Sequence, residues 1–174
     1  MAIKIKRADL DAIKNHGEET YPHECCGFLI GTNVDGVNHL GKALRAENQW
    51  PAEPGKRPSE LTEAATQTVS ASQSQNAAAA PAKVESPRNR YLITPEQWKT
   101  ADAHARELGL GIIGYYHSHP DHPAAPSGFD LDHSCWPGES YIIVSIQQGK
   151  AADLNSFNKP DYEKFEQEEI LIED

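Results

Sequence analysis

The chain has 174 residues, of which 38% are hydrophobic, enough for one folded domain with a real core. Its formal net charge of −10, with no cluster of Lys and Arg, argues against binding to a nucleic-acid backbone. No apolar run approaches a membrane span and residues 1–11 contain no apolar leader, so we expect a cytoplasmic protein without membrane partners.

The N-terminal part predicts a strand, a helix and a hairpin. Isoleucines alternate with lysines over residues 2–6, which is typical of a half-buried strand. The apolar spacing that follows predicts a helix capped by Asp9 and ending near Gly17. Residues 26–31 and 37–47 are expected to form a hairpin around the turn sequence NVDGV.

Residues 49–89 differ in composition from the rest of the chain. They are rich in Ala, Ser, Gln, Thr and Pro and contain few large apolar side chains. Such a stretch cannot bury enough apolar surface to offset the entropy of ordering it. We therefore expect a single domain over residues 1–174 with a disordered insertion at about 49–89, and the alternative is a loop that recognises the substrate.

The best-marked helix follows this stretch. Residues 91–93 read as a short strand, and Thr94, Pro95 and Gln97 supply a cap, a proline at the first helical position and a capping-box partner. The predicted helix ends near Gly109, a residue type that commonly terminates helices.

The remaining chain predicts strands around one short helix. GIIGYYHSH and SYIIVSI read as central strands, SGFDLDHSC as the start of a helix, and residues 152–172 as one or two further strands. These elements predict an α+β fold in which helices pack against a curved mixed β-sheet.

Three side chains in this region have the spacing of a metal site. His117 and His119 leave the same face of a predicted strand, and Asp130 lies in the first turn of the next helix. Two imidazoles and one carboxylate leave a fourth tetrahedral position open, as in catalytic zinc sites. A lone H-x-H often binds no metal, however, and Ser127 with Asp130 could be a simple helix-capping pair.

The segments YPHECCGFLIG and HSHPDHPAAPSGFD resemble the motif of the JAMM (MPN+) metalloprotease family: an upstream glutamate, then H-[ST]-H-P and S-x-x-D. The resemblance is to the small stand-alone prokaryotic type and implies an MPN fold, a cytidine-deaminase-like α-β-α sandwich. It implies one Zn²⁺ per chain held by His117, His119 and Asp130. It also implies that Glu24 is the general base and that Ser127 helps to stabilise the oxyanion.

Other reactive side chains are expected to take no part in metal binding or catalysis. A fourth protein ligand from His122 or His133 would close the open metal position. Cys25 and Cys26 fit packing better than nucleophilic catalysis, because no group that would activate a thiolate is visible. A redox role for Cys135 stays open.

The resemblance also implies a substrate class. The expected reaction is hydrolysis of a peptide or lysine isopeptide bond at the C-terminus of a small ubiquitin-like protein of the sulfur-carrier type, ending in Gly-Gly. Two glycines can enter a narrow channel in extended form and pair with a sheet edge. The alternative is a catalytically silent binding module on the same fold, against which the complete motif argues. A zinc deaminase would need a P-C-x-x-C segment, which the chain lacks.

Overall fold

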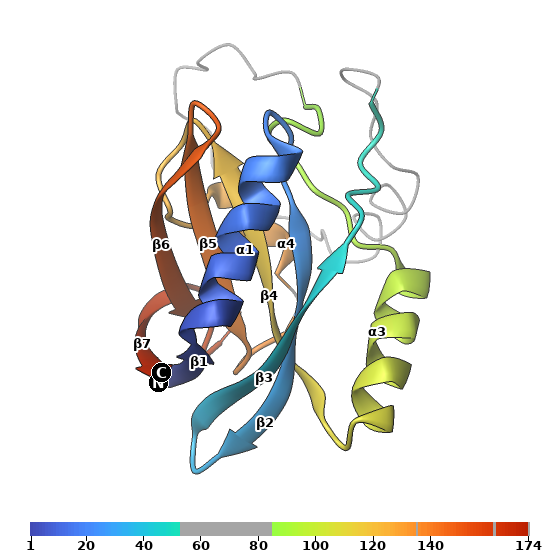
Figure 1. Ribbon diagram of the computed structural model, residues 1–174, viewed down its shortest axis with the longest axis vertical. Coiled ribbons are helices and arrows are strands. Elements are labelled where there is room, and N and C mark those ends of the chain that lie inside the picture. Colours follow the sequence, from blue (N-terminus) through green and yellow to red (C-terminus); the bar gives the residue numbers. More distant parts are fainter. Residues whose placement is uncertain (53–84, 135, 162, 174) are drawn as a thin grey trace.

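The computed structural model describes residues 1–52, 85–134, 136–161 and 163–173 (Figure 1). The predicted insertion at about 49–89 falls largely on residues outside these ranges. In chain order the described elements are β1 (Ala2–Lys6), α1 (Arg7–Thr20), β2 (Cys26–Val34), β3 (Val37–Ala46), α3 (Pro95–Glu107), β4 (Gly111–Pro120), α4 (Gly128–His133), β5 (Ser140–Gln147), β6 (Lys150–Asn158) and β7 (Glu166–Glu173).

The sheet is mixed, as predicted, but it closes into a barrel in the order β1-β3-β2-β4-β5-β6-β7. The predicted curved sheet of a sandwich is corrected in this respect, because β1 pairs in parallel with both β3 and β7. Ala2 lies opposite Val37 on one side and Glu169 on the other. The N-terminal strand therefore joins the first hairpin to the C-terminal strand and removes both free edges.

The predicted helices on the two faces of the sheet are confirmed. Leu29 of β2 packs in a core cluster with Leu10 and Ile13 of α1. The neighbouring Phe28, whose side chain points the other way, packs with Ala101 of α3. Figure 1 shows α1 and α3 on either side of β2. Successive apolar residues of β2 point to opposite faces of the sheet and thus contribute to two core clusters, one under α1 and one under α3.

Helix α1 differs from its predicted limits. It begins directly after β1, where Lys6 makes no side-chain cap, and Asp9 lies within the first turn. It also continues past Gly17 to Thr20. A Cβ at Gly17 would come within 2.8 Å of Ile146 Cδ1, so this glycine permits close packing of α1 on β5 and does not end the helix.

The β2–β3 hairpin and helix α3 follow their sequence signals. The hairpin turns at Asp35 and Gly36, both with positive φ, as expected of a two-residue turn. Helix α3 begins with the predicted capping box between Thr94 and Gln97. Leu108 is 50% exposed, because the helix has already ended at Glu107.

The predicted strand at residues 91–93 is wrong. These residues have no partner strand in the described chain. One backbone bond joins them to the end of the first hairpin, where the Gln49 N–H donates to Leu92 O at 3.0 Å. The Leu92 N–H instead donates to the side chain of Asn48. The side chain of Asn48 therefore accepts a backbone hydrogen bond that a neighbouring strand would otherwise accept.

The chain after α4 forms three strands, β5, β6 and β7. Two of them, β6 and β7, account for the one or two strands predicted over residues 152–172. Strand β5 pairs in parallel with β4, and β6 and β7 continue the sheet as antiparallel neighbours. None of the helices in the described ranges combines the length and apolar character needed to cross a bilayer.

Candidate metal centre

The two predicted metal-binding histidines lie side by side near the end of β4. His117 is opposite Cys26 of β2, and His119 is opposite Ser145 of β5. Because their positions differ by two along one strand, their rings leave the same face of the sheet. The exposed fraction is 2% for His117 and 8% for His119, so both rings are buried at this end of the barrel.

Helix α4 brings Asp130 to the two rings. The distance from His117 Nε2 to His119 Nε2 is 3.0 Å, and those from the two Nε2 atoms to Asp130 Oδ1 and Oδ2 are 3.2 and 3.5 Å. All three ligand atoms lie within 4.8 Å of one another. Two imidazole nitrogens and one carboxylate oxygen form a donor set that zinc accepts. The three residues therefore fit a single metal ion.

Ser127 fixes the start of α4 and the direction of Asp130. The Ser127 hydroxyl and N–H both donate to Asp130 Oδ2 at 2.6 Å, and the Asp130 N–H donates back to Ser127 Oγ at 3.2 Å. This capping box is the simpler of the two roles considered from the sequence, and it leaves Oδ1 facing His117.

A buried lysine holds the other end of α4. Lys159, 2% exposed, donates from Nζ to the carbonyl oxygens of Leu131 and Ser134 at 2.8 and 2.9 Å. A positive charge at the last carbonyl groups of a helix satisfies their hydrogen bonds and opposes the helix dipole. No sequence pattern indicates this contact, because Lys159 follows β6, in a different part of the chain from α4.

The two rings are also held from outside the metal group. His119 Nδ1 lies 2.9 Å from the carbonyl oxygen of Pro123, a backbone contact that fixes the orientation of a metal-binding ring. Tyr91 stacks on His117 with ring centroids 4.7 Å apart and an interplanar angle of 26°. Sequence reasoning missed Tyr91, because it assigned this residue to a strand.

Glu24 precedes β2 and is buried beside the metal group, with an exposed fraction of 7%. It does not belong to the three-residue metal group found among the described side chains. The neighbouring Cys25 N–H donates to Ser118 Oγ at 2.8 Å, and the Ser118 N–H donates to Cys25 O at 3.1 Å. Since Ser118 stands between the two histidines, this pair of bonds ties the backbone at Glu24 to the ligands.

The two acidic groups of the site have opposite pKa shifts. Burial, followed by the charge of Asp130, raises the pKa of Glu24 well above its ordinary value, with partial opposition from Arg90. Burial also opposes ionisation of Asp130, but the charges and hydrogen bonds of His117 and His119 outweigh it and lower its pKa. Burial lowers the pKa of His117, which favours the neutral, metal-binding form.

The side chains excluded on sequence grounds are not members of the metal group found among the described residues. His122 and His133 are exposed, and His133 Nδ1 lies 2.9 Å from Phe129 O within α4. Cys25 and Cys26 are buried free thiols, and burial raises the pKa of Cys25 to about 12, which leaves it protonated. Cys135 lies outside the described residues.

A mixed barrel sheet with this polar group at the end of β4 matches a known class of domain. Residues 6–158 match the family of prokaryotic homologs of the JAB domain, and the chain belongs to that family. The resemblance to small prokaryotic JAMM/MPN proteins noted from the sequence is thereby confirmed.

Several individual proteins are similar to this chain. A protein of Salinibacter ruber is 34% identical in sequence, with a TM-score of 0.64 over 100% of this chain and 92% of that one. A protein of Desulfitobacterium hafniense has the same fold, with a TM-score of 0.70, 22% identity, and coverage of 99% and 93%. A desampylase of Haloferax volcanii is 36% identical over 59 residues, or 34% of this chain and 42% of that protein. The chain thus aligns with less than half of this curated relative.

Proposed function

We propose that the protein is a zinc-dependent peptidase or isopeptidase that cuts at the C-terminus of a small, Gly-Gly-ended ubiquitin-like protein of the sulfur-carrier type. The observation that carries the proposal is the buried group of His117, His119 and Asp130 next to a buried Glu24. Membership of the JAB-domain family and similarity to a protein named desampylase support hydrolysis of a bond to a small modifier protein.

In this proposal, His117, His119 and Asp130 hold one zinc ion per chain. Zinc would supply a Lewis acid and would lower the pKa of a bound water to about 7. The protein prepares the donor set by keeping His117 neutral and Asp130 ionised, the forms that bind a cation. The Pro123 carbonyl and the Tyr91 ring keep the imidazoles in place before any metal arrives.

Glu24 is the proposed proton carrier. Its carboxyl is buried and has a raised pKa, and this makes the ionised carboxylate a stronger base toward the attacking water. The same group can then donate that proton to the departing amine. This second transfer matters for an amide, because an amine leaves poorly without a proton.

Ser127 has two proposed roles that compete for one hydroxyl. The hydroxyl donates to Asp130 Oδ2, so it can stabilise an oxyanion only when it turns away from that acceptor. The Ser127 backbone N–H, which donates to the same oxygen, would keep the carboxylate oriented meanwhile. The oxyanion role therefore needs a rotation of the side chain but no movement of α4.

Three further predictions belong to this proposal. We keep residues 1–174 as one domain with an insertion at about 49–89, a cytoplasmic location, and a protein substrate in place of a nucleic acid. The net charge of −10 supports the last point, because an acidic surface repels phosphate groups.

The test is cleavage by protein loaded with zinc. Two substrates are compared: a ubiquitin-like protein with a C-terminal extension after Gly-Gly, and the same protein joined to a lysine side chain. Release from either, lost when Gly-Gly is replaced by Ala-Ala, is the expected result. Zinc-loaded protein that binds these substrates but cuts neither would instead support the silent binding module.

A further inference from the structure

Asn48 lies just after β3 and connects three separate segments through its side-chain amide. Its Nδ2 group donates to Glu24 O at 3.1 Å and to Arg90 O at 3.0 Å. Its Oδ1 atom accepts from the N–H groups of Trp50 and Leu92 at 2.9 and 3.1 Å. An amide side chain offers two donor hydrogens and two acceptor positions, so these bonds use its full capacity.

The contacts of Asn48 surround two groups of the metal centre. One bond reaches the backbone of Glu24, whose N–H donates to Pro87 O at 2.8 Å on the other side. Two others reach Arg90 and Leu92, the residues on either side of Tyr91. Tyr91 in turn stacks on His117 at 4.7 Å. One side chain thus contacts the backbone at Glu24 and on both sides of Tyr91.

The backbone groups that Asn48 binds lie outside the helices and strands of the described chain. The described segment at residues 91–94 has no partner strand, and Glu24 lies before the first residue of β2. Asn48 binds two backbone carbonyl groups through its Nδ2 group and two backbone N–H groups through its Oδ1 atom. Aspartate would lack the two donor hydrogens, and alanine would lack all four contacts.

We propose that Asn48 is a positioning residue that holds Glu24 and Tyr91 in place around the metal ligands. Its effect on catalysis rests on the proposed function, whereas its effect on the order of the site does not. Asn48 acts through the backbone of other residues and makes no contact with the reacting atoms.

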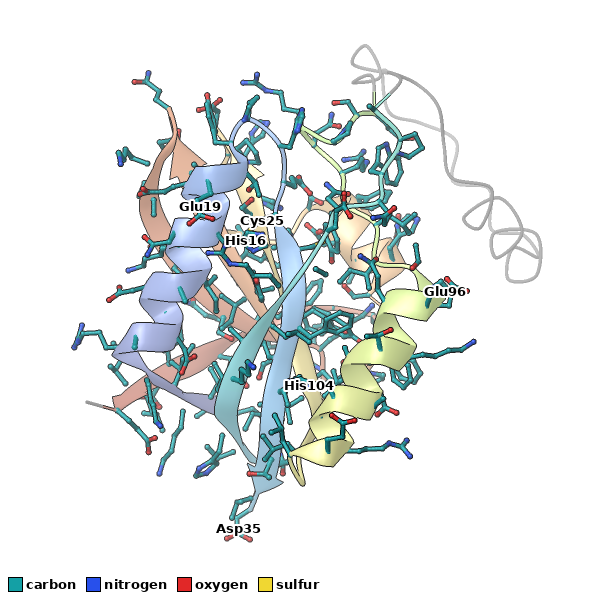
Figure 2. The ribbon with its side chains drawn as sticks, turned by 45° about the vertical axis from the view of Figure 1, so that its right-hand side comes forward. His16, Glu19, Cys25, Asp35, Glu96 and His104 are labelled. Atoms are coloured by element: carbon teal, nitrogen blue, oxygen red, sulfur yellow. The ribbon has the colours of Figure 1, made fainter. Side chains whose placement is uncertain are left out.

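The experiment compares Asn48→Asp and Asn48→Ala with Asn33→Ala as the matched control. Asn33 also uses its amide in two contacts, to Asn38 Oδ1 and from the Gly36 N–H, but it lies beside the hairpin turn. Figure 2 shows Asp35 of this turn at the far tip of the hairpin from Cys25, the neighbour of Glu24.

Two sets of measurements are made on each variant. Zinc content, kcat and KM report on the loaded enzyme, and amide hydrogen exchange at Leu92 and Trp50 reports on the positioning itself. In Asn48→Ala we expect both amides to lose protection and kcat to fall by about 10- to 100-fold, the scale of a displaced supporting group. KM and zinc content should change far less, because the ligands and the substrate-binding surface remain.

Asn48→Asp separates the effect of the two donor contacts of the amide from that of its two acceptor contacts. It retains the acceptor oxygen, so the Leu92 and Trp50 amides should stay protected, while the lost donors should still reduce kcat through Glu24. This variant also serves if Asn48→Ala fails to fold. Asn33→Ala should leave kcat and both amides unchanged.

The outcomes distinguish this inference from the proposed function. Zinc-loaded wild-type protein that cuts no substrate would remove the proposed function, and the exchange at Leu92 and Trp50 would then decide on Asn48 alone. Retained protection of both amides in Asn48→Ala would overturn the positioning role. In an active enzyme, unchanged kcat in both Asn48 variants would also overturn it.

Discussion

The metal centre has two sides that are built in different ways. The ligand side, residues 117–130, is a continuous stretch in which a strand, a loop and a capped helix bring the three ligands together. The Glu24 side is assembled from Glu24, residues 48–50 and residues 85–92, which are joined by Asn48. Local sequence can encode the first side, whereas the second exists only in the folded chain.

This difference separates metal binding from chemistry. The ligand side contains every member of the metal group, and the Glu24 side contains the buried carboxyl with the raised pKa. Damage to the ligand side should therefore remove metal and activity together. Damage to the Glu24 side should remove activity and leave the metal in place.

The largest effect is expected for the histidines. His117→Ala or His119→Ala removes one of three ligands, so zinc should be lost and cleavage should fall to background. Metal analysis after gel filtration, combined with the cleavage assay, measures both. His122→Ala is the control, because this exposed residue lies outside the metal group. Full zinc retention in both ligand variants would show that the ion binds elsewhere.

The next effect concerns Glu24. Glu24→Gln keeps the shape of the side chain but cannot accept a proton, so kcat should fall by roughly 10²- to 10⁴-fold. Zinc content, measured on the same sample, should not change. Glu96→Gln, at the start of α3 (Figure 2), provides a control for the loss of one negative charge. Loss of zinc in Glu24→Gln would make Glu24 a ligand or a structural support, and the proposed division between the two sides would fail.

The same difference explains what the sequence could predict. His117, His119, Asp130 and Ser127 lie within a short stretch, and the structure brings the three ligands together as the spacing indicates. The capping box at Ser127 is likewise a local signal. These features depend on residues that are close together in the sequence, so the local sequence is sufficient to predict them.

The features that the sequence did not predict depend on distant contacts. Asn48 has a residue type common in turns, and nothing near it indicates that it contacts both Glu24 and Leu92. Tyr91 resembled a strand residue because the apolar residues Leu92 and Ile93 follow it. The barrel closes through β1 and β7, which lie at opposite ends of the chain. Composition and periodicity do not specify such pairs.

A smaller effect is expected at Ser127, on the ligand side. Ser127→Ala removes the cap of α4 and the hydroxyl bond to Asp130 but keeps the backbone bond. Loss of a cap costs about 1 kcal/mol of stability. Loss of a group that orients a ligand weakens metal affinity by about 10- to 100-fold. Denaturant unfolding and zinc competition measure these effects, and Ser127→Thr should restore both. Unchanged zinc affinity in Ser127→Ala would show that the hydroxyl does not orient Asp130 for metal binding.

The smallest effect is a shift in titration, and it compares the two sides directly. In metal-free protein with ¹³C-labelled carboxyl groups, Glu24 should titrate above its ordinary pKa of 4.5 and Asp130 below its ordinary pKa of 3.8. Glu24 accepts a proton only when ionised, so a raised pKa means that this capacity is lost at a higher pH as the solution is acidified.

Arg90 provides the means to change this titration. Its positive charge lowers the pKa of Glu24, so Arg90→Gln should raise that pKa further. Arg88→Gln is the control, because Arg88 pairs with Asp121 at 2.8 Å and does not contribute to the Glu24 shift. Asp130 should respond far less to either change, since burial and the two histidines on its own side determine its pKa. An equal response of both carboxyl groups to Arg90→Gln would show that the two sides form one electrostatic unit.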